Sequence, residues 1–379
     1  MTSKGAGREK GREGGRPPVR LLAVSSVVAA LLALAVCKVA QVPAVPARPS
    51  KVIMGYYVSW KQTEFDHTQV RYEYLTHIAH AFVWPDPSGN IVVPPGFLYP
   101  ELNAAARAHG VKMMVSVGGG GNCAGFPGAS STTANRARFV GQLVDLCRTS
   151  AYDGVDLDWE FVSNEEERVN FTLLAEELGA ALKAQSPPLL LTMAAPGNNF
   201  YGRWIEFERL SAAFDLIGFM TYDYHGTWSG HSGHNAPLTA GADVACGSLD
   251  ASFGYALSRR VPPDKILVGL AFYGRSFDCG GLGLPFTSSE YWPYNEVMKL
   301  PEAEWALIWD GAAQVPYLRS RDGGMIVSFD DMRSISLKCQ YVKDKRSAGV
   351  IIWELSQDRR AGTSELLQVV GKSFGAGAR

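Results

Sequence analysis

Residues 152–161 read YDGVDLDWEF, in which acids alternate with large apolar side chains. In a β-strand, side chains two positions apart share a face, so Asp156, Asp158 and Glu160 are expected together on one side. A helix would turn residues two apart by roughly 200° and would scatter the three acids. A solvated acidic face is the plainer interpretation, but neighbouring carboxylates repel one another. The pattern therefore favours a strand whose acids serve chemistry.

Short apolar runs of this kind recur along the chain from residue 51. Eight are expected as strands: 52–58, 78–83, 113–119, 154–161, 189–195, 216–222, 266–273 and 349–355. Nearly continuous apolar strands are typical of a buried parallel sheet, and helical patterns at 134–149 and 164–185 lie between them. The sequence predicts an α/β fold, a (β/α)8 TIM barrel, with a doubly wound open sheet as the alternative.

The stretch between the last two expected strands is too long for a simple connection. It contains VPYLR and MIVSFD, separated by SRDGG, which is typical of a β-hairpin. A small or reduced α+β insertion is therefore expected between strands 7 and 8, at about residues 278–330.

The N-terminal region does not read as part of the barrel. Residues 1–20 carry six Lys or Arg against two Glu, residues 21–37 are apolar apart from two Ser, and residues 41–50 contain three Pro. Residues 1–40 are predicted to be a basic segment with a signal peptide or a signal anchor, followed by a Pro-rich linker at 41–50. Seventeen apolar residues span about 25 Å as a helix, so a single membrane span at 21–40 stays open.

The barrel domain, residues 51–379, is accordingly expected outside the cytoplasm, either secreted or held at the membrane. In an oxidising compartment, Cys246 and Cys279 are the preferred disulfide pair.

Composition and motifs exclude several classes of site. A net charge of −1 argues against nucleic-acid binding. The run VSVGGGGNC lacks the Lys-Ser/Thr ending of a phosphate loop, and the cysteine spacing fits no zinc pattern. No cofactor and no metal is expected.

In a TIM barrel the working groups cluster at the C-terminal ends of the strands. The residues at those expected ends are mostly aromatic, with one cluster of acids and one Arg: Tyr56, Phe82, Ser116, Glu160, Met193, Met220, Tyr222, Asp223, Tyr273, Arg275 and Trp353.

On these residues the chain resembles glycoside hydrolase family 18, the chitinases and their relatives, over about residues 51–360. DGVDLDWE matches the family signature D-x-x-D-x-D-x-E without a gap. Four further motifs follow the family's order: SVGG at 116–119, MTYDYHG at 220–226, FYGRSF at 272–277 and IIWEL at 351–355.

The resemblance implies catalytic roles for four residues. Glu160 would be the general acid and base, and Asp158 would turn between Asp156 and the N-acetyl group of the substrate. Tyr222 would hold the acetyl carbonyl oxygen, with Asp223 close to the same group. Asp156 would tune the charge of its neighbour.

The resemblance also implies a substrate-binding surface. Trp353 would floor the cleavage subsite, and the other positions implied are Tyr56, Phe82, Ser116, Gly119, Met220, Tyr273 and Arg275, with Asp153 in a supporting role. Gly120 and Gly121 stand where many relatives have Trp, so one subsite is expected to be weaker. Trp228 is expected to supply stacking there.

The function implied is hydrolysis of β-1,4 linkages between N-acetylglucosamine units, in chitin or its oligosaccharides, by a monomeric enzyme. Two carboxylates on one strand face approach a sugar from the same side, which suits an acid and an orienting partner while the acetamido oxygen attacks its own anomeric carbon. The second carboxylate would also raise the pKa of Glu160. The alternatives are an endo-β-N-acetylglucosaminidase, a chitobiase or a hydrolase of bacterial wall sugars, a sugar-binding lectin, which usually lacks the acid at Glu160, and a non-catalytic membrane scaffold.

Overall fold

The apolar runs form a closed barrel. The computed structural model describes residues 49–241, 247–360 and 362–376, all within the unit Pro46–Arg379. Within these ranges eight parallel strands pair in a ring, because β1 bonds to both β2 and β14. The ring is β1 (Val52–Val58), β2 (His77–Pro85), β4 (Lys112–Gly118), β5 (Gly154–Asp158), β6 (Leu190–Pro196), β7 (Leu216–Met220), β8 (Ile266–Ala271) and β14 (Gly349–Trp353). The short β3 (Ile91–Val92) adds to β2 in the antiparallel direction. The predicted TIM barrel is confirmed.

Alternation along the strands separates two apolar layers. Val155 and Leu157 of β5 are fully buried in the large core that also holds the helices' apolar stripes. Met54 and Tyr56 of β1 belong instead to a small cluster with Leu267, which fills the barrel interior. Each strand therefore holds the helices with one face and builds the barrel's centre with the other.

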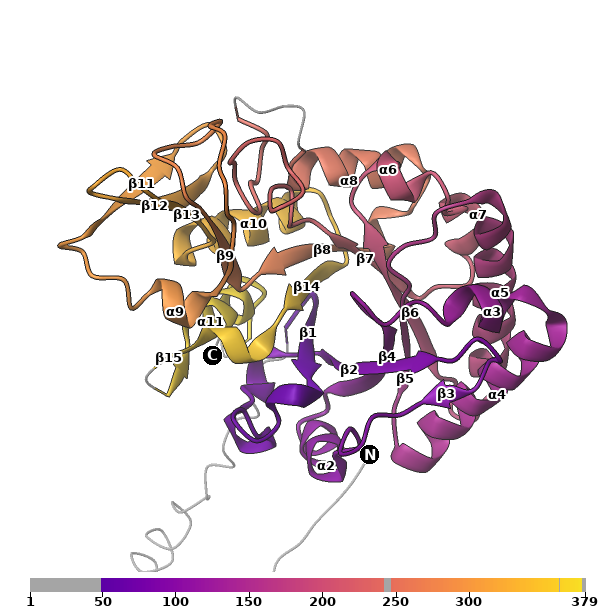
Figure 1. The fold of residues 1–379 in the computed structure, drawn as a ribbon. Helices are drawn as coiled ribbons and strands as arrows, with labels where there is room; N and C mark the ends of the chain where they lie inside the picture. Colours follow the sequence, from indigo (N-terminus) through magenta and orange to yellow (C-terminus); the bar gives the residue numbers. More distant parts are fainter. Residues whose placement is uncertain (1–48, 242–246, 361, 377–379) are drawn as a thin grey trace, which may run out of the picture. The chain divides into compact units, whose positions relative to one another are not determined.

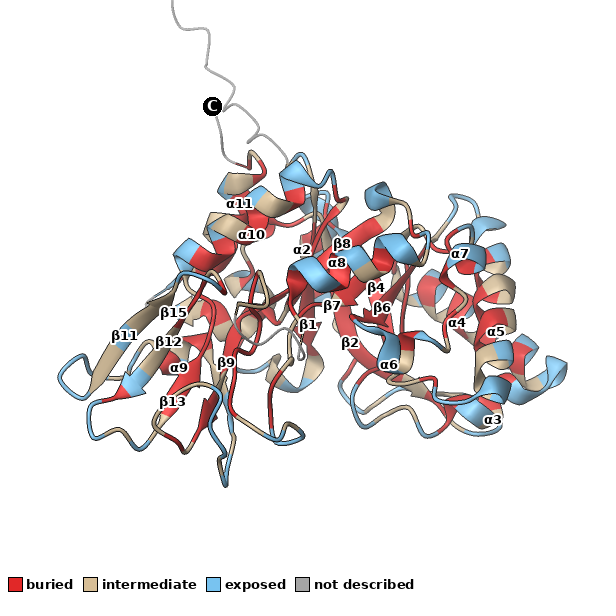
Figure 2. Cartoon of the chain, turned by 90° about the horizontal axis from the view of Figure 1, so that it is seen from above, coloured by how far each residue is buried: buried red, intermediate tan, exposed pale blue. Residues whose placement is uncertain are grey.

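Helices surround the strands (Figure 1). They are α2 (Pro100–Ala108), α3 (Phe126–Ser131), α4 (Thr133–Ser150), α5 (Glu165–Lys183), α6 (Asn199–Gly202), α7 (Phe207–Leu210), α8 (Leu249–Ser258), α10 (Met332–Asp344) and α11 (Glu365–Ser373). Figure 2 shows buried residues along the strands and on the inward faces of α4 and α5. The Asn164 side chain caps α5 by accepting the Glu167 N–H at 2.9 Å, and this fixes where the predicted helix begins.

A five-stranded sheet lies between β8 and β14. Its order is β10 (Tyr291–Pro293), β9 (Tyr273–Phe277), β13 (Ile326–Ser328), β12 (Val315–Ser320) and β11 (Trp305–Asp310), with α9 (Tyr294–Val297) between β10 and β11. β12 and β13 form the predicted hairpin. A further short pair is β15 (Arg359–Arg360) with β16 (Thr363–Ser364).

Five strands end earlier than the sequence suggested: β4, β5, β7, β8 and β14. β5 stops at Asp158, so Glu160 lies beyond the strand, and β7 stops at Met220, before Tyr222. β8 stops at Ala271, and the chain then enters the inserted sheet as β9, five residues before the expected start of the insertion at 278. Apolar residues continue past these strand ends because the loops that follow are also buried. Hydrophobicity alone therefore does not show where a strand ends and its loop begins.

Two expectations fall on or near residues that the structure leaves undescribed. Residues 1–48, with the predicted signal or anchor, lie outside the described ranges, as does Cys246. The four described cysteines, Cys279 among them, are free thiols. No helix in the described part of the chain has the length and apolarity needed to cross a bilayer.

Candidate active site

Asp156 lies inside the barrel, held by three neighbouring strands. Its carboxylate accepts hydrogen bonds from Tyr56 Oη on β1 and Ser116 Oγ on β4, both at 2.8 Å, and from Thr192 Oγ1 on β6 at 2.6 Å. It is 1% exposed, and burial raises its pKa while the three hydrogen bonds oppose that rise. Asp156 and Ser116 therefore lie beneath the cavity and do not line it.

Asp158 lies above Asp156 at the end of β5 and lines the cavity. It is 3% exposed, and its Oδ1 has no hydrogen-bond partner among the described residues. Burial raises its pKa well above the ordinary value, and the charges of Glu160 and Asp156 add to the rise. An unpartnered buried oxygen is unusual in a native protein, and the residue that carries it lines the cavity.

Glu160 lines the same cavity from the loop after β5. Burial, then the charge of Asp223, raises its pKa to about 7, against a hydrogen bond from the Gly120 backbone that lowers it. The pKa of Glu160 is raised as expected, but burial is the larger cause, and the charge that adds to it belongs to Asp223 and not to the expected Asp158. The group is therefore placed to carry a proton near neutrality.

Asp223 joins the barrel to the inserted sheet. Its Oδ1 accepts from Tyr273 Oη at 2.7 Å and from Arg275 Nε at 2.8 Å, and both donors lie on β9. Asp223 adopts a left-handed φ of 59° directly after Tyr222, whose ring lies edge-on to that of Tyr273. Burial raises the pKa of Tyr222 well above its usual value, so its hydroxyl remains a donor.

An aromatic wall closes the floor of the cavity. The Trp353 ring stacks on Phe82 at 5.9 Å and lies 5.3 Å from Tyr56. Trp60, two residues past β1, lies 6.5 Å from Trp353. The cavity holds about 330 Å³ and is lined by Tyr56, Trp60, Phe82, Gly120, Asn122, Asp158, Glu160, Ala194, Met220, Tyr222, Asp223, Tyr273, Arg275, Tyr291 and Trp353.

Several predicted residues take other places. Gly119 does not line the cavity. A Cβ at this position would lie 2.4 Å from the Phe82 ring, so the glycine allows the ring to pack closely against the backbone. Trp228 is 58% exposed and packs under the Arg275 guanidinium at 4.6 Å, outside the cavity lining. Asp153 precedes β5 at its amino end, where it pairs with Lys112 at 2.8 Å, so it does not support the site.

Sequence reasoning missed four lining residues, Trp60, Asn122, Ala194 and Tyr291, and it noted Gly120 only as the position where many relatives have Trp. Trp60 carried a signal, because this aromatic residue lies two positions after a strand whose end was already predicted to face the site. Tyr291 carried none, because it comes from β10 of the inserted sheet. It reaches the cavity by stacking on Tyr273 at 4.3 Å.

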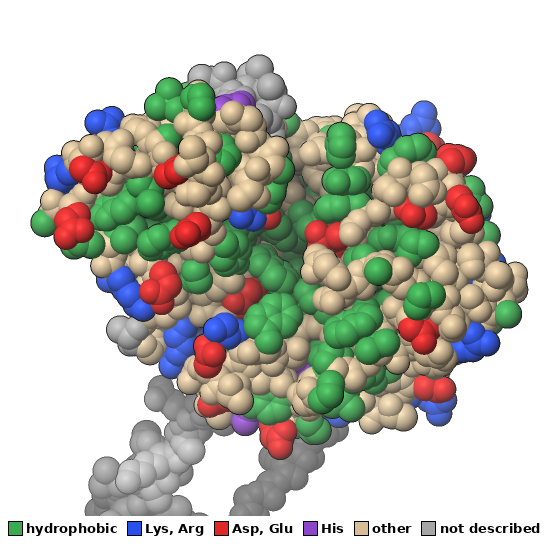
Figure 3. Space-filling view, viewed as in Figure 1, with side chains coloured by type: hydrophobic (Ala, Val, Ile, Leu, Met, Phe, Trp, Pro, Cys, Tyr) green, Lys and Arg blue, Asp and Glu red, His purple; other side chains and the backbone are tan. Residues whose placement is uncertain are grey.

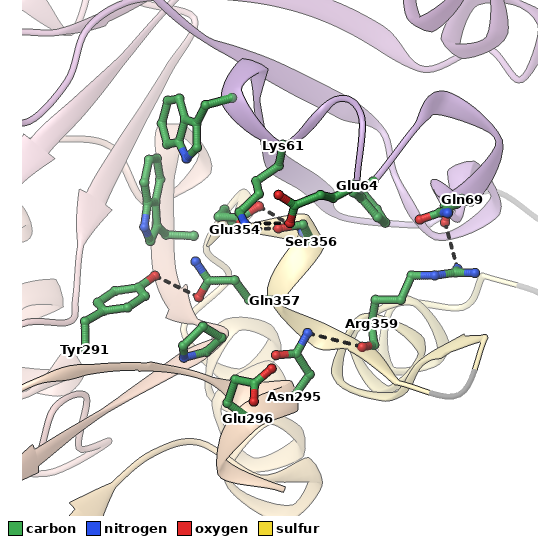
Figure 4. Close-up of a pocket in the computed structure, with 14 residues that line it drawn as sticks. Lys61, Glu64, Gln69, Tyr291, Asn295, Glu296, Glu354, Ser356, Gln357 and Arg359 are labelled. Carbon is green, nitrogen blue, oxygen red and sulfur yellow. Dashed lines mark hydrogen bonds and ion pairs between the residues drawn. The ribbon is translucent and has the colours of Figure 1, made fainter. Parts of the chain in front are cut away.

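A second hollow of about 720 Å³ adjoins the cavity and shares Trp60, Tyr291 and Trp353 with it. Figure 3 shows the recessed centre of this face with hydrophobic side chains on its walls. Figure 4 shows the polar groups that reach into the second hollow, including Gln357, which accepts from Tyr291 Oη at 2.7 Å. The two hollows together form a long, mixed aromatic and polar surface.

The arrangement offers a buried protonated carboxyl, a second carboxyl with a free oxygen, and a phenol donor. The lining residues include no Ser, Thr or Cys nucleophile. Among the residues that the structure describes, no cluster of His, Cys, Asp or Glu is arranged to hold a metal ion. The site can donate and accept protons around a ligand that supplies its own nucleophile.

Comparisons with known proteins agree with this geometry. Chitinase A1 of Niallia circulans is 30% identical over 81% of this chain, and the chain spans 56% of that relative's length. A glycoside hydrolase family 18 N-acetylglucosaminidase from Paenibacillus barengoltzii is 31% identical, with a TM-score of 0.78 over 85% of this chain and 99% of that one. A Cycas revoluta chitinase solved with (GlcNAc)3 is 25% identical, with a TM-score of 0.78 over 86% of this chain and 100% of that one. The family model described as Glycosyl hydrolases family 18 matches residues 52–358, and the chain belongs to that family.

Proposed function

We propose that this protein hydrolyses β-1,4 linkages between N-acetylglucosamine units in chitin or its oligosaccharides, with retention of anomeric configuration. The observation that carries the proposal is the pair Asp158 and Glu160 in one cavity, one with an unpartnered oxygen and the other with a pKa of about 7. Relatives named chitinase, and one solved with (GlcNAc)3, support the substrate class.

In the first step Glu160 gives its proton to the glycosidic oxygen as the bond to the anomeric carbon breaks. The acetamido oxygen of the same sugar forms a new bond to that carbon, giving a cyclic oxazolinium ion. The Asp158 carboxylate accepts the acetamido N–H and stabilises the positive charge, while Tyr222 Oη donates to the acetamido oxygen, and both residues line the cavity. The turn of Asp158 toward Asp156 stays a prediction.

In the second step the Glu160 carboxylate takes a proton from water. The water oxygen attacks the anomeric carbon, and the bond from this carbon to the acetamido oxygen breaks, which opens the oxazolinium ring and leaves the sugar ring closed. The acetamido oxygen and the water attack opposite faces of the anomeric carbon. Each attack inverts the configuration, so the product keeps the configuration of the substrate. The aromatic floor of Trp353 suits the apolar face of a pyranose ring.

A second candidate is an N-acetylglucosaminidase that acts on other glycans, because the Paenibacillus relative carries that name. The large adjoining hollow favours an oligosaccharide over a single terminal sugar. We further propose that the catalytic domain works as a monomer outside the cytoplasm, after export directed by residues 1–40.

The experiment is a product profile of the full-length protein on (GlcNAc)4 to (GlcNAc)6 and on a glycoprotein glycan, with the anomer followed by NMR. The chitin oligomers should be cut and the β-anomer should form first. The α-anomer would contradict the acetamide mechanism, and cleavage of the glycan alone would favour the second candidate.

Glu160→Gln tests the acid. It should lower kcat by at least about 10²- to 10⁴-fold, the usual scale for a positioned acid, with sugar binding nearly intact by calorimetry. Near-normal turnover would exclude Glu160 from the reaction. Asp153→Asn is the matched control, because this acid lies at the other end of β5.

A further inference from the structure

The loop that follows β4 makes close contacts with the backbone that carries the two carboxyls. Gly119 N–H donates to Asp158 O at 2.8 Å. Cys123, in the same loop, places its sulfur 3.4 Å from Asp158 O and 3.4 Å from Gly119 O. The sulfur also accepts the Glu160 N–H at 3.1 Å. One side chain therefore contacts the backbone on both sides of Trp159.

The Glu160 contact matters because β5 has already ended. The ladders from β5 to β4 and β6 stop at or before Asp158, so the Glu160 N–H has no strand partner. A buried amide without a partner is costly, and in this site the Cys123 sulfur takes the place of the missing carbonyl.

The thiol is suited to this double role. Burial raises the pKa of Cys123 to about 12, so the group stays protonated at neutral pH. Its S–H can then donate to Asp158 O or Gly119 O while its lone pair accepts from Glu160. A protonated thiol is a poor nucleophile, which agrees with a role in holding the backbone.

We propose that Cys123 is a positioning residue for the hydrolysis, which aims the Glu160 carboxyl by holding its peptide group. This proposal rests on the proposed function, in which Glu160 is the general acid. Cys123 itself does not line the cavity, so its proposed effect is exerted through the peptide group of Glu160.

Two substitutions separate hydrogen bonding from packing. Cys123→Val fills a similar volume but cannot accept the Glu160 N–H, whereas Cys123→Ser keeps an acceptor on a shorter side chain. Cys339→Val is the matched control, because Cys339 is a buried cysteine on α10 that contacts neither carboxyl.

Cys123→Val should lower kcat by about 10- to 100-fold, the scale for a reacting group displaced by about 1 Å, with KM changed less than about twofold. The alkaline limb of kcat should move to lower pH, because a displaced Glu160 loses part of the burial that raises its pKa. Cys123→Ser should keep most of kcat, and the alkaline limb of its pH profile should lie at the same pH as in the wild type. Cys339→Val should match the wild type in both readouts.

Thermal unfolding of each variant confirms that the assayed protein is folded. If the valine protein does not fold, Cys123→Ala makes the same comparison, since it also lacks an acceptor and needs less space. Wild-type kcat and pH limb in the valine or alanine protein would overturn the positioning role, and so would equal losses in the valine and serine proteins. An inactive wild type would contradict the proposed function instead.

Discussion

At the scale of single residues, Glu160 shows how a carboxyl becomes an acid near neutral pH. Its pKa is raised first by burial and then by the charge of Asp223, and the Gly120 backbone opposes the rise. A general acid works best with a pKa near the working pH. The pKa of Glu160 therefore depends on the loop after β4, on the loop after β7 and on the walls of the cavity.

The pH profile should report this environment. Because the reaction needs protonated Glu160, kcat/KM should fall as the pH rises through about 7. Asp223→Asn removes a negative charge that raises the pKa, so the alkaline limb should move to lower pH. The measurement is kcat/KM against pH for both proteins, with Asp153→Asn as a control that keeps the wild-type limb. An unmoved limb in Asp223→Asn would contradict the assignment of this charge.

At the scale of elements, the buried Lys338 of α10 forms an ion pair with Asp330, just before the helix, and a hydrogen bond to the loop that follows β7. Lys338 and Asp330 are 0% and 1% exposed, and they form an ion pair. Lys338 Nζ also donates to the carbonyl of Ala236, next to Asn235, whose Oδ1 accepts the Asp223 N–H at 3.3 Å. The pair thus supports the loop that carries part of the active site.

Lys338→Met should lower the free energy of unfolding by about 3–5 kcal/mol, because it leaves the buried Asp330 charge unpaired. Lys338→Met combined with Asp330→Leu should recover much of that loss, since both charges are then gone. Denaturant unfolding of the two variants and the wild type gives the comparison. Equal losses in the single and double variants would show that packing, and not the unpaired charge, is responsible.

At the scale of the whole molecule, the barrel and the inserted sheet share one groove. Tyr273 and Arg275 of β9 bond to Asp223 of the barrel, and Tyr291 of β10 reaches both hollows. Trp60 lies between the hollows and is 57% exposed. A chain of several sugars could therefore contact both surfaces at once.

The groove predicts a dependence on substrate length. We expect kcat/KM to rise from (GlcNAc)2 to (GlcNAc)6, and Trp60→Ala to lower it about 3- to 10-fold on the longest substrate, the scale of one aromatic stacking contact. The effect on the dimer should be smaller. Phe200→Ala is the control, because this exposed aromatic residue lines neither hollow. A loss that is equal at all lengths would argue against an extended groove.

The sequence by itself determined the strands of the barrel and the acids at the end of β5. The alternation over 152–161 and the other apolar runs indicate which segments are buried as strands. This information lies in a few consecutive residues, because a strand that is buried on both faces is apolar along its whole length. The signature that ends at Glu160 is also contiguous, so its acids could be placed on one strand end without coordinates. The hairpin of β12 and β13 was predictable from its turn residues for the same reason.

Only the tertiary structure decided what surrounds the acids. Tyr291 enters the site from the inserted sheet, Trp228 packs under Arg275 outside the cavity, and Cys123 bonds to Glu160 across 37 positions of sequence. Thr192 completes the support of Asp156 from the next strand. These contacts join segments that no local pattern relates, because they depend on how the loops and the insertion close over the barrel's rim.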